Sequence, residues 1–205
     1  MSSSSFLINP RISLVADASV IINLNATGRA AEIIKAFPNP FMAAENACAE
    51  LEAGARNGHT DHHQLVELID AGLVQQVSLG SSGARVYESL IDGSALRTLD
   101  DGEAATIAYA DEKGCAALID ERKARSLCAA SFPRLLIAST VELLMHDAIA
   151  AALGPQGRID ALTNALTNAR MRVPSEHLAR VRTIIGAERA ASCPSLPKHV
   201  PETSV

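Results

Sequence analysis

The sequence contains no tryptophan, and aromatic residues make up only 3% of its 205 positions. An aromatic core is therefore excluded, and leucine, isoleucine, valine and alanine must fill the interior. Cysteine is also sparse, and the four residues Cys48, Cys115, Cys128 and Cys193 show no CxxC spacing. This pattern indicates neither a zinc knuckle nor a disulfide framework, and it fits reduced thiols in a cytoplasm.

A surplus of basic residues is missing as well. The formal net charge of -5 argues against a protein that coats nucleic acid by bulk electrostatics, although it is compatible with an acidic metal site. The most apolar stretch, 135–153, is interrupted by Glu142, His146 and Asp147, which would be costly in lipid. The first residues lack the apolar run of a signal peptide. We therefore expect neither a membrane partner nor export.

Short apolar runs alternate with helical patterns along most of the chain. Strands are expected at 13–17, 41–44, 73–79, 116–120 and 135–139. Helical spacing or helix-stop residues mark the segments between them, and a long helix is expected over 140–153. This alternation predicts an α/β fold in which helices cover both faces of a parallel sheet.

The chain is long enough for one domain with an appendage, but not for two full domains. We expect a flexible N-terminal segment over 1–11 and the main domain over 12–155. A helical extension is expected over 156–190, with helices near 158–169 and 174–188. The last segment, 191–205, carries three prolines and little apolar content, so we expect it to be disordered.

Two acids stand at the ends of expected strands. Asp17 closes the run SLVAD, and Asp120 closes AALID. Open parallel sheets place their ligands at the carboxyl ends of their strands, so these acids would converge if their strands are neighbours. Each could equally cap the next helix, since an aspartate accepts bonds from the free amides there.

Two glutamates extend this set. Glu103 shares a helical stripe with Ile107 and Ala110, which should face inward, although Asp100 and Glu103 also have capping-box spacing. Glu50 lies on the flank of an apolar helix face, where a solvated charge is the ordinary outcome. Converging carboxylates repel one another unless they bind a hard divalent cation such as Mg²⁺ or Mn²⁺. Such a site can hydrolyse phosphodiesters, so the set predicts a nuclease.

The motifs LVADAS, AELE, LDDGEAATIAYA and ALIDERKAR occur in an order and spacing that resemble a PIN domain. The resemblance covers roughly residues 12–150, and its Gly-Glu and Ile-Asp-Glu elements are similar to a bacterial branch related to VapC-type toxins. It implies a three-layer α/β/α sandwich around a central parallel sheet, with extra C-terminal helices beyond it. It also implies an endoribonuclease that cleaves single-stranded RNA with Mg²⁺ or Mn²⁺, and as partners an antitoxin protein or a second copy of the chain.

The resemblance assigns roles to individual residues. The metal-binding and catalytic acids would be Asp17, Glu50, Glu103 and Asp120. Auxiliary roles fall to Ser19, Asp101 and Glu121, and phosphates of the substrate would meet Arg122, Lys123 and Arg125. The chain departs from the family in carrying Glu121 where a second aspartate is commoner. The later arginines Arg170, Arg172, Arg180 and Arg182 are open to RNA binding, partner binding or simple solubility, and solubility is the simplest interpretation.

Other functions fit the sequence less well. A haloacid dehalogenase-type phosphohydrolase requires a second acid where this chain has Ser19, and a receiver domain requires an aspartate near Leu79. His59, His62 and His63 resemble a metal site only superficially, because they stand at an expected helix start. The alternative to a nuclease is a catalytically silent PIN-fold module that binds nucleic acid or protein.

Overall fold

The computed structural model describes residues 5–92 and 98–197. Its strands form one parallel sheet in the order β3-β2-β1-β4-β5. The strands are β1 (Leu14–Ala16), β2 (Phe41–Ala44), β3 (Val74–Val77), β4 (Ala116–Leu118) and β5 (Leu136–Ala138). The predicted α/β class with a central parallel sheet is confirmed.

The two central strands, β1 and β4, pair directly with each other. Leu14 lies opposite Ala116, and Ala16 lies opposite Leu118. All three residues of each strand are buried, as expected for strands that helices cover on both faces. This register brings the carboxyl ends of β1 and β4 side by side, which is where the two strand-end aspartates stand.

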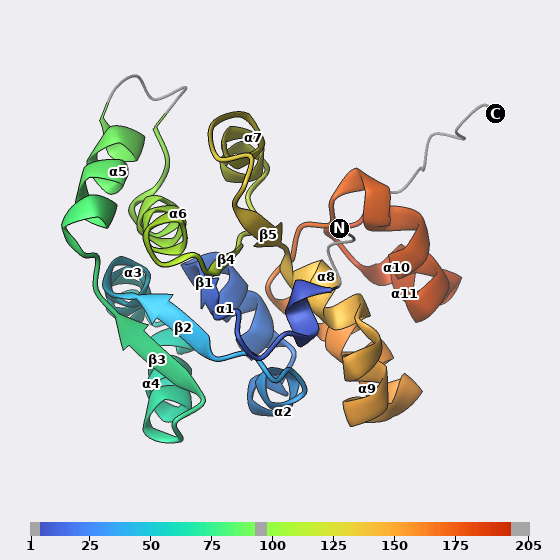
Figure 1. The fold of residues 1–205 in the computed structure, drawn as a ribbon. Coiled ribbons are helices and arrows are strands. Elements are labelled where there is room, and N and C mark those ends of the chain that lie inside the picture. The colour runs from blue at the N-terminus through green and yellow to red at the C-terminus, as the bar shows by residue number, and fades with distance from the viewer. Residues whose placement is uncertain (1–4, 93–97, 198–205) are drawn as a thin grey trace.

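Helices surround the sheet and continue beyond it, as Figure 1 shows. Those up to β4 are α1 (Ala18–Ala26), α2 (Ala30–Lys35), α3 (Glu45–Ala55), α4 (Asp61–Asp70), α5 (Ser81–Ile91) and α6 (Asp101–Lys113). Those after β4 are α7 (Arg122–Ser131), α8 (Thr140–Met145), α9 (Asp147–Asn168), α10 (Leu178–Ile185) and α11 (Ala187–Ser192). Two short 3-10 turns are η1 (Phe6–Ile8) and η2 (Ser175–His177). Among the described residues, no helix combines the length and the apolar character needed to cross a membrane.

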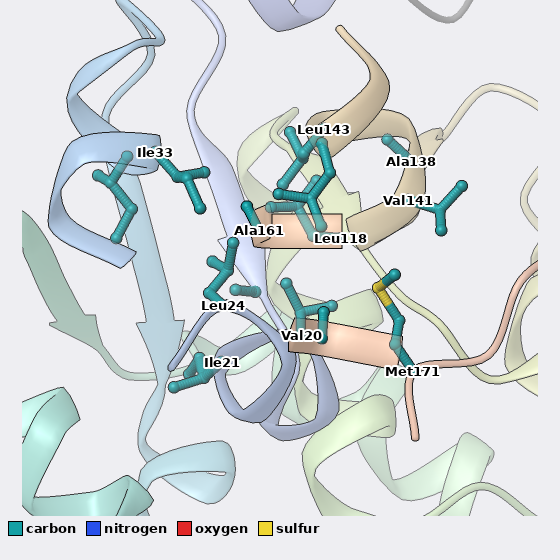
Figure 2. Close-up of a cluster of buried hydrophobic side chains, with 14 of the residues drawn as sticks. Val20, Ile21, Leu24, Ile33, Leu118, Ala138, Val141, Leu143, Ala161 and Met171 are labelled. Carbon is teal, nitrogen blue, oxygen red and sulfur yellow. The ribbon is translucent and has the colours of Figure 1, made fainter. Parts of the chain in front are cut away.

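Side chains of the sheet separate into two hydrophobic clusters, one on each face. Leu14 and Leu118 belong to the cluster that includes residues of α1, α2, α4, α8 and α9. Val15 and Ala117 belong to the other, with residues of α5, α6 and α7. Figure 2 shows Leu118 within the first cluster. The strand alternation therefore produces the predicted three-layer sandwich.

The long helix expected over 140–153 is broken at His146. The backbone there is extended, with ψ of 146°, and the His146 side chain accepts a bond from the Ala148 N–H at 3.1 Å. This cap separates α8 from α9. Gly154, where the sequence predicted a helix end, has a φ of 71° and a non-helical conformation inside α9. Helix α1 occupies the run after Asp17, in agreement with the interpretation of Asp17 as a helix cap.

The C-terminal helices pack on the domain and do not lead directly into a disordered tail. Val181 and Ile185 of α10 belong to the first cluster, and so do Cys193 and Leu196. Ser195 also donates to the Leu166 carbonyl at 3.0 Å. The prediction of disorder from 191 onward is therefore wrong for 191–197, because cysteine and leucine in that stretch are apolar enough to anchor it. Residues 198–205 lie outside the described part of the chain.

The N-terminal segment is also held in place where the structure describes it. Phe6 and Leu7 are buried in the first cluster. The Asn39 side-chain amide donates to the carbonyls of Phe6 at 2.9 Å, Asn9 at 2.9 Å and Ile12 at 2.8 Å. The expected flexibility of 1–11 is therefore contradicted for 6–11, while residues 1–4 lie outside the described ranges.

We predict that Asn39→Ala lowers the free energy of unfolding by about 1–3 kcal/mol, because three backbone carbonyls lose their donor in a buried setting. Thermal unfolding followed by circular dichroism measures this change. The matched control is Asn57→Ala, since Asn57 is exposed and should change stability by less than about 0.5 kcal/mol. Equal melting temperatures for the two variants would show that Asn39 does not hold the segment.

Candidate active site

A cavity of about 280 Å³ opens at the carboxyl edge of the sheet, next to the ends of β1 and β4. Six acidic side chains line it: Asp17, Glu50, Asp100, Glu103, Asp120 and Glu121. They come from α3, from the start of α6 and from the two strand ends. The structure thus brings together, in one cavity, the four acids that the sequence nominated as metal ligands.

Asp17 both caps a helix and lines the cavity. It is the N-cap of α1, where its Oδ2 accepts bonds from the Ser19 hydroxyl at 2.7 Å and the Ser19 N–H at 3.4 Å. The residue is 3% exposed. Burial raises the pKa of Asp17, with a further contribution from the nearby charge of Asp120, while the bonds to Ser19 oppose the rise.

Asp120 is held by the start of α8 and does not cap the helix that follows it in sequence. Its Oδ1 accepts from the Thr140 N–H at 2.7 Å. Its Oδ2 accepts from the Asn23 amide at 2.7 Å and the Thr140 hydroxyl at 2.5 Å. Burial raises the pKa of Asp120, and these bonds together with the charge of Arg125 act in the opposite direction. Both oxygens of Asp120 are therefore engaged within the protein.

Glu103 forms a capping box with Asp100 at the start of α6. The Asp100 N–H donates to Glu103 Oε2 at 3.4 Å. Glu103 is only 7% exposed and lines the cavity, so the capping box forms part of the cavity wall. Burial, followed by the charge of Asp17, raises the pKa of Glu103 to about 7.

Glu50 lines the same cavity from helix α3. A Cβ atom built on Gly102 would lie 2.7 Å from Glu50 Oε2 and 3.1 Å from Asp17 Oδ1. Glycine at 102 therefore leaves the space into which two carboxylate oxygens converge. Loss of hydration raises the pKa of Glu50, and the charges of Asp17, Asp100 and Asp101 add to the effect.

The three auxiliary residues differ in position. Ser19 lines the cavity and holds Asp17, and Glu121 lines it while pairing with Arg172. Asp101 instead accepts bonds from Tyr87 and from Asn46, the latter at 3.0 Å. Asp100 lines the cavity, whereas Asp101 does not. The two consecutive residues at the start of α6 point in different directions, which sequence spacing alone does not reveal.

The three predicted phosphate-binding residues do not line the cavity among the described residues. Arg125 donates to the Ile119 carbonyl at 3.3 Å and pairs with Glu142 at 3.4 Å. Lys123 donates to the Thr98 carbonyl. Arg122 opens α7 as an exposed residue. Arg125 stays close enough for its charge to act on Asp120, but the bonds of Arg125 and Lys123 go to groups that do not line the cavity.

Basic side chains reach the cavity from the end of α9 instead. Arg170 and Arg172 both line it, and Arg170 has a φ of 54°, which is uncommon for a residue with a side chain. Between them, Met171 is 1% exposed and packs in the first hydrophobic cluster, where Figure 2 shows it with Val20. Met171 thus anchors a short segment that presents two arginines to the acids.

Sequence reasoning also missed Asn23 and Thr140, the two residues that hold Asp120. Asn23 is 5% exposed and stands in the otherwise apolar run VIINL. A buried asparagine requires a hydrogen-bond partner, so its place in that run is a usable signal. Thr140 gave no comparable signal, because its role depends on the pairing of β4 with β5.

The donor set fits a hard divalent cation, because carboxylate oxygens dominate the cavity wall. Burial, together with the charge of neighbouring carboxylates, raises the pKa values of Asp17 and Glu103. As the side chains stand, no three or more His, Cys, Asp or Glu residues within 5–92 and 98–197 form a ready metal site. The acids are therefore gathered around one cavity without yet enclosing an ion.

Comparison with known proteins agrees with this geometry. A family model described as a PIN domain matches residues 13–187, which includes α10 and most of the C-terminal extension. The chain matches none of the curated proteins and none of the solved structures. PIN domains are generally metal-dependent nucleases, so the fold and the acidic cavity are of a nuclease type. Because the match spans most of the sequence, the chain belongs to the PIN-domain family.

Proposed function

We propose that this protein is a metal-dependent endoribonuclease that hydrolyses single-stranded RNA at the acidic cavity. The observation that carries the proposal is that carboxylate oxygens of Glu50 and Asp17 both lie next to Gly102. They come from separate elements, and placing two negative charges there costs electrostatic repulsion. A structural role alone gives no reason to place Glu50 there. RNA as the substrate rests on the family resemblance.

Asp17, Glu50, Glu103 and Asp120 would hold Mg²⁺ or Mn²⁺. When bound, the ion would supply an activated water and neutralise charge on the scissile phosphate. Asp17 offers Oδ1, since Ser19 occupies Oδ2, and Asp120 offers a carboxylate that Thr140 and Asn23 fix in position. Because the acids do not yet enclose an ion, we expect the side chains of Glu50 and Glu103 to turn inward on binding.

The substrate phosphate would meet arginines on the cavity wall. Arg170 and Arg172 line the cavity that holds the acids, and an arginine forms paired bonds with phosphate. Arg172 already pairs with Glu121, so phosphate would compete for it. The role first assigned to Arg122, Lys123 and Arg125 has less support, because the structure directs the bonds of Lys123 and Arg125 elsewhere.

A toxin role with an antitoxin partner, and self-association, stay predictions from the resemblance. Both concern the regulation of the proposed nuclease and not its chemistry. The competing function is a silent PIN-fold binding module, which would keep the fold and bind RNA without cleaving it. The two functions differ in one observable property, the dependence of cleavage on the acids.

Glu50→Gln should reduce the rate of Mn²⁺-dependent cleavage, because the ion loses an anionic oxygen. We expect a loss greater than the roughly 10–100-fold that is typical when a residue supporting a metal ligand is replaced. Fluorescence release from a doubly labelled single-stranded RNA measures the rate. Glu52→Gln is the matched control, since it makes the same change on the same helix at an exposed position outside the cavity. We expect it to retain the wild-type rate.

Equal rates for these two variants would remove Glu50 from the site. RNA binding without cleavage in the wild-type protein, with Mg²⁺ and with Mn²⁺, would instead favour the silent module.

The stability of the metal-free protein should fall as the pH rises from about 4.5 to about 7. The folded-state pKa of Glu103 is raised from 4.5 to about 7, so the native state binds more protons than the unfolded state in that window. The stabilising effect of the proton is complete below the unfolded-state pKa and is lost as the pH passes the folded-state value. Melting temperatures in EDTA at pH 5 and pH 7 measure this difference.

Glu103→Gln should make that dependence shallower, because it removes one of the acids whose pKa is raised in the native state. Added Mn²⁺ should reverse the trend in the wild-type protein, since the ion binds the ionised acids of the native state. A melting temperature that Mn²⁺ leaves unchanged at pH 7 would contradict a metal site in this cavity.

A further inference from the structure

A second cavity, of about 590 Å³, adjoins the acidic one. Three residues line both cavities: Ile22, Glu50 and Ala169. The second cavity lies between α1, the end of α3, the start of α4 and the end of α9. A chain molecule held at the acids can therefore extend into it without leaving the surface of the protein.

The chemistry of the second cavity differs from that of the first. Among the described residues that line it, His59 is the one basic side chain, and no lysine or arginine provides a permanent positive charge for a phosphate. Its polar side chains are mainly uncharged donors and acceptors, among them Asn25, Asn57, Gln64 and Asn168. Groups of this type recognise the uncharged part of a nucleotide, which is the base and the sugar.

Asn25 supplies the most specific feature. It is only 8% exposed, and its Nδ2 donates to the Asp61 carbonyl and to Asp61 Oδ1, both at 3.3 Å. This fixes the orientation of the amide, because a flipped amide would set its oxygen against two acceptors. The opposite atom, Asn25 Oδ1, is buried and has no hydrogen-bond partner among the described residues. This oxygen is closed to the cavity, so Asn25 acts on a ligand through the Asp61 carboxylate that its amide positions.

We propose that the second cavity is a nucleoside-binding subsite for the residue next to the scissile phosphate, and that it prefers bases with an exocyclic amino group. This deepens the proposed function and rests on it. Asp61 lines the cavity, and its carboxylate is an acceptor that the Asn25 amide holds in position, so the cavity favours a ligand with N–H donors. Adenine and cytosine carry an amino group on their pairing edge, and uracil does not. The cavity volume lies in the range of small-molecule sites.

Two asparagines of α9 offer a matched test. Asn168 lines the cavity and donates to the Ala26 carbonyl at 3.3 Å. Asn164, one turn earlier, donates to the Thr27 carbonyl at 3.2 Å and does not line it. Each substitution by alanine removes one side-chain bond to the end of α1. Only Asn168→Ala also removes a polar group from the cavity.

Both substitutions are made in full-length protein that carries Glu103→Gln, which keeps the RNA intact if the proposed function holds. Binding of a fluorescein-labelled eight-residue oligoadenylate in Mg²⁺ is followed by anisotropy. We expect Asn168→Ala to weaken binding about fivefold, the effect of one hydrogen bond, and Asn164→Ala to leave it unchanged. Equal affinities for the two variants would overturn the subsite. Degradation of the RNA by the Glu103→Gln protein would instead contradict the proposed role of that acid, so the two failures are distinguishable.

Asn25→Ala tests base preference in the same protein. The parent should bind oligoadenylate more tightly than oligouridylate of equal length, and Asn25→Ala should remove that preference. A purely structural effect would lower both affinities by the same factor and leave their ratio unchanged, which would overturn the assignment of Asn25. A parent that binds neither oligonucleotide would overturn the subsite as a whole.

Discussion

Repulsion between carboxylates that share the carboxyl edge of the sheet is the constraint on which this arrangement depends. Among the helices that begin at that edge are α1 after Asp17, α6 after Asp100 and α8 beside Asp120. A helix start presents free N–H groups and the positive end of the helix dipole. Ser19 and Thr140 donate such N–H groups directly to the acids. The fold therefore offsets part of the negative charge with backbone groups before any cation binds.

Helix capping and metal binding are not alternatives for these acids, because one carboxylate has two oxygens. The two bonds that Ser19 donates to Asp17 both use Oδ2, and Oδ1 lies beside the same point above Gly102 as Glu50 Oε2. Asp120 has both oxygens engaged by Thr140 and Asn23. Asp17 is thus the more open donor, and Asp120 is the more firmly positioned one. A substitution at Asp120 disturbs the start of α8 as well as the cavity, so Glu50 gives the clearer functional test.

Much of the fold followed from the sequence because local signals were strong. Apolar runs that end in Asp17 and Asp120 predicted the strand ends, and the capping-box spacing of Asp100 and Glu103 marked the start of α6. The break at His146 was missed, since a histidine side chain that caps a helix has no strong sequence signal. The two arginines of the cavity wall were named from the sequence, but solubility was the simplest interpretation of them. Arg170 is about 150 residues from Asp17 in the chain, and only tertiary packing brings their segments together.

That packing makes the C-terminal extension part of the domain that builds the acidic cavity. Leu162 and Leu166 of α9 are fully buried in the same cluster as Leu118 of the central sheet, so the helix completes the hydrophobic layer beneath the cavity. Met171 continues the cluster by one further turn and fixes the segment that bears Arg170. The family match reaches residue 187, which agrees with this continuity. A boundary drawn near 155 would expose one face of the sheet and remove the cavity wall in the same step.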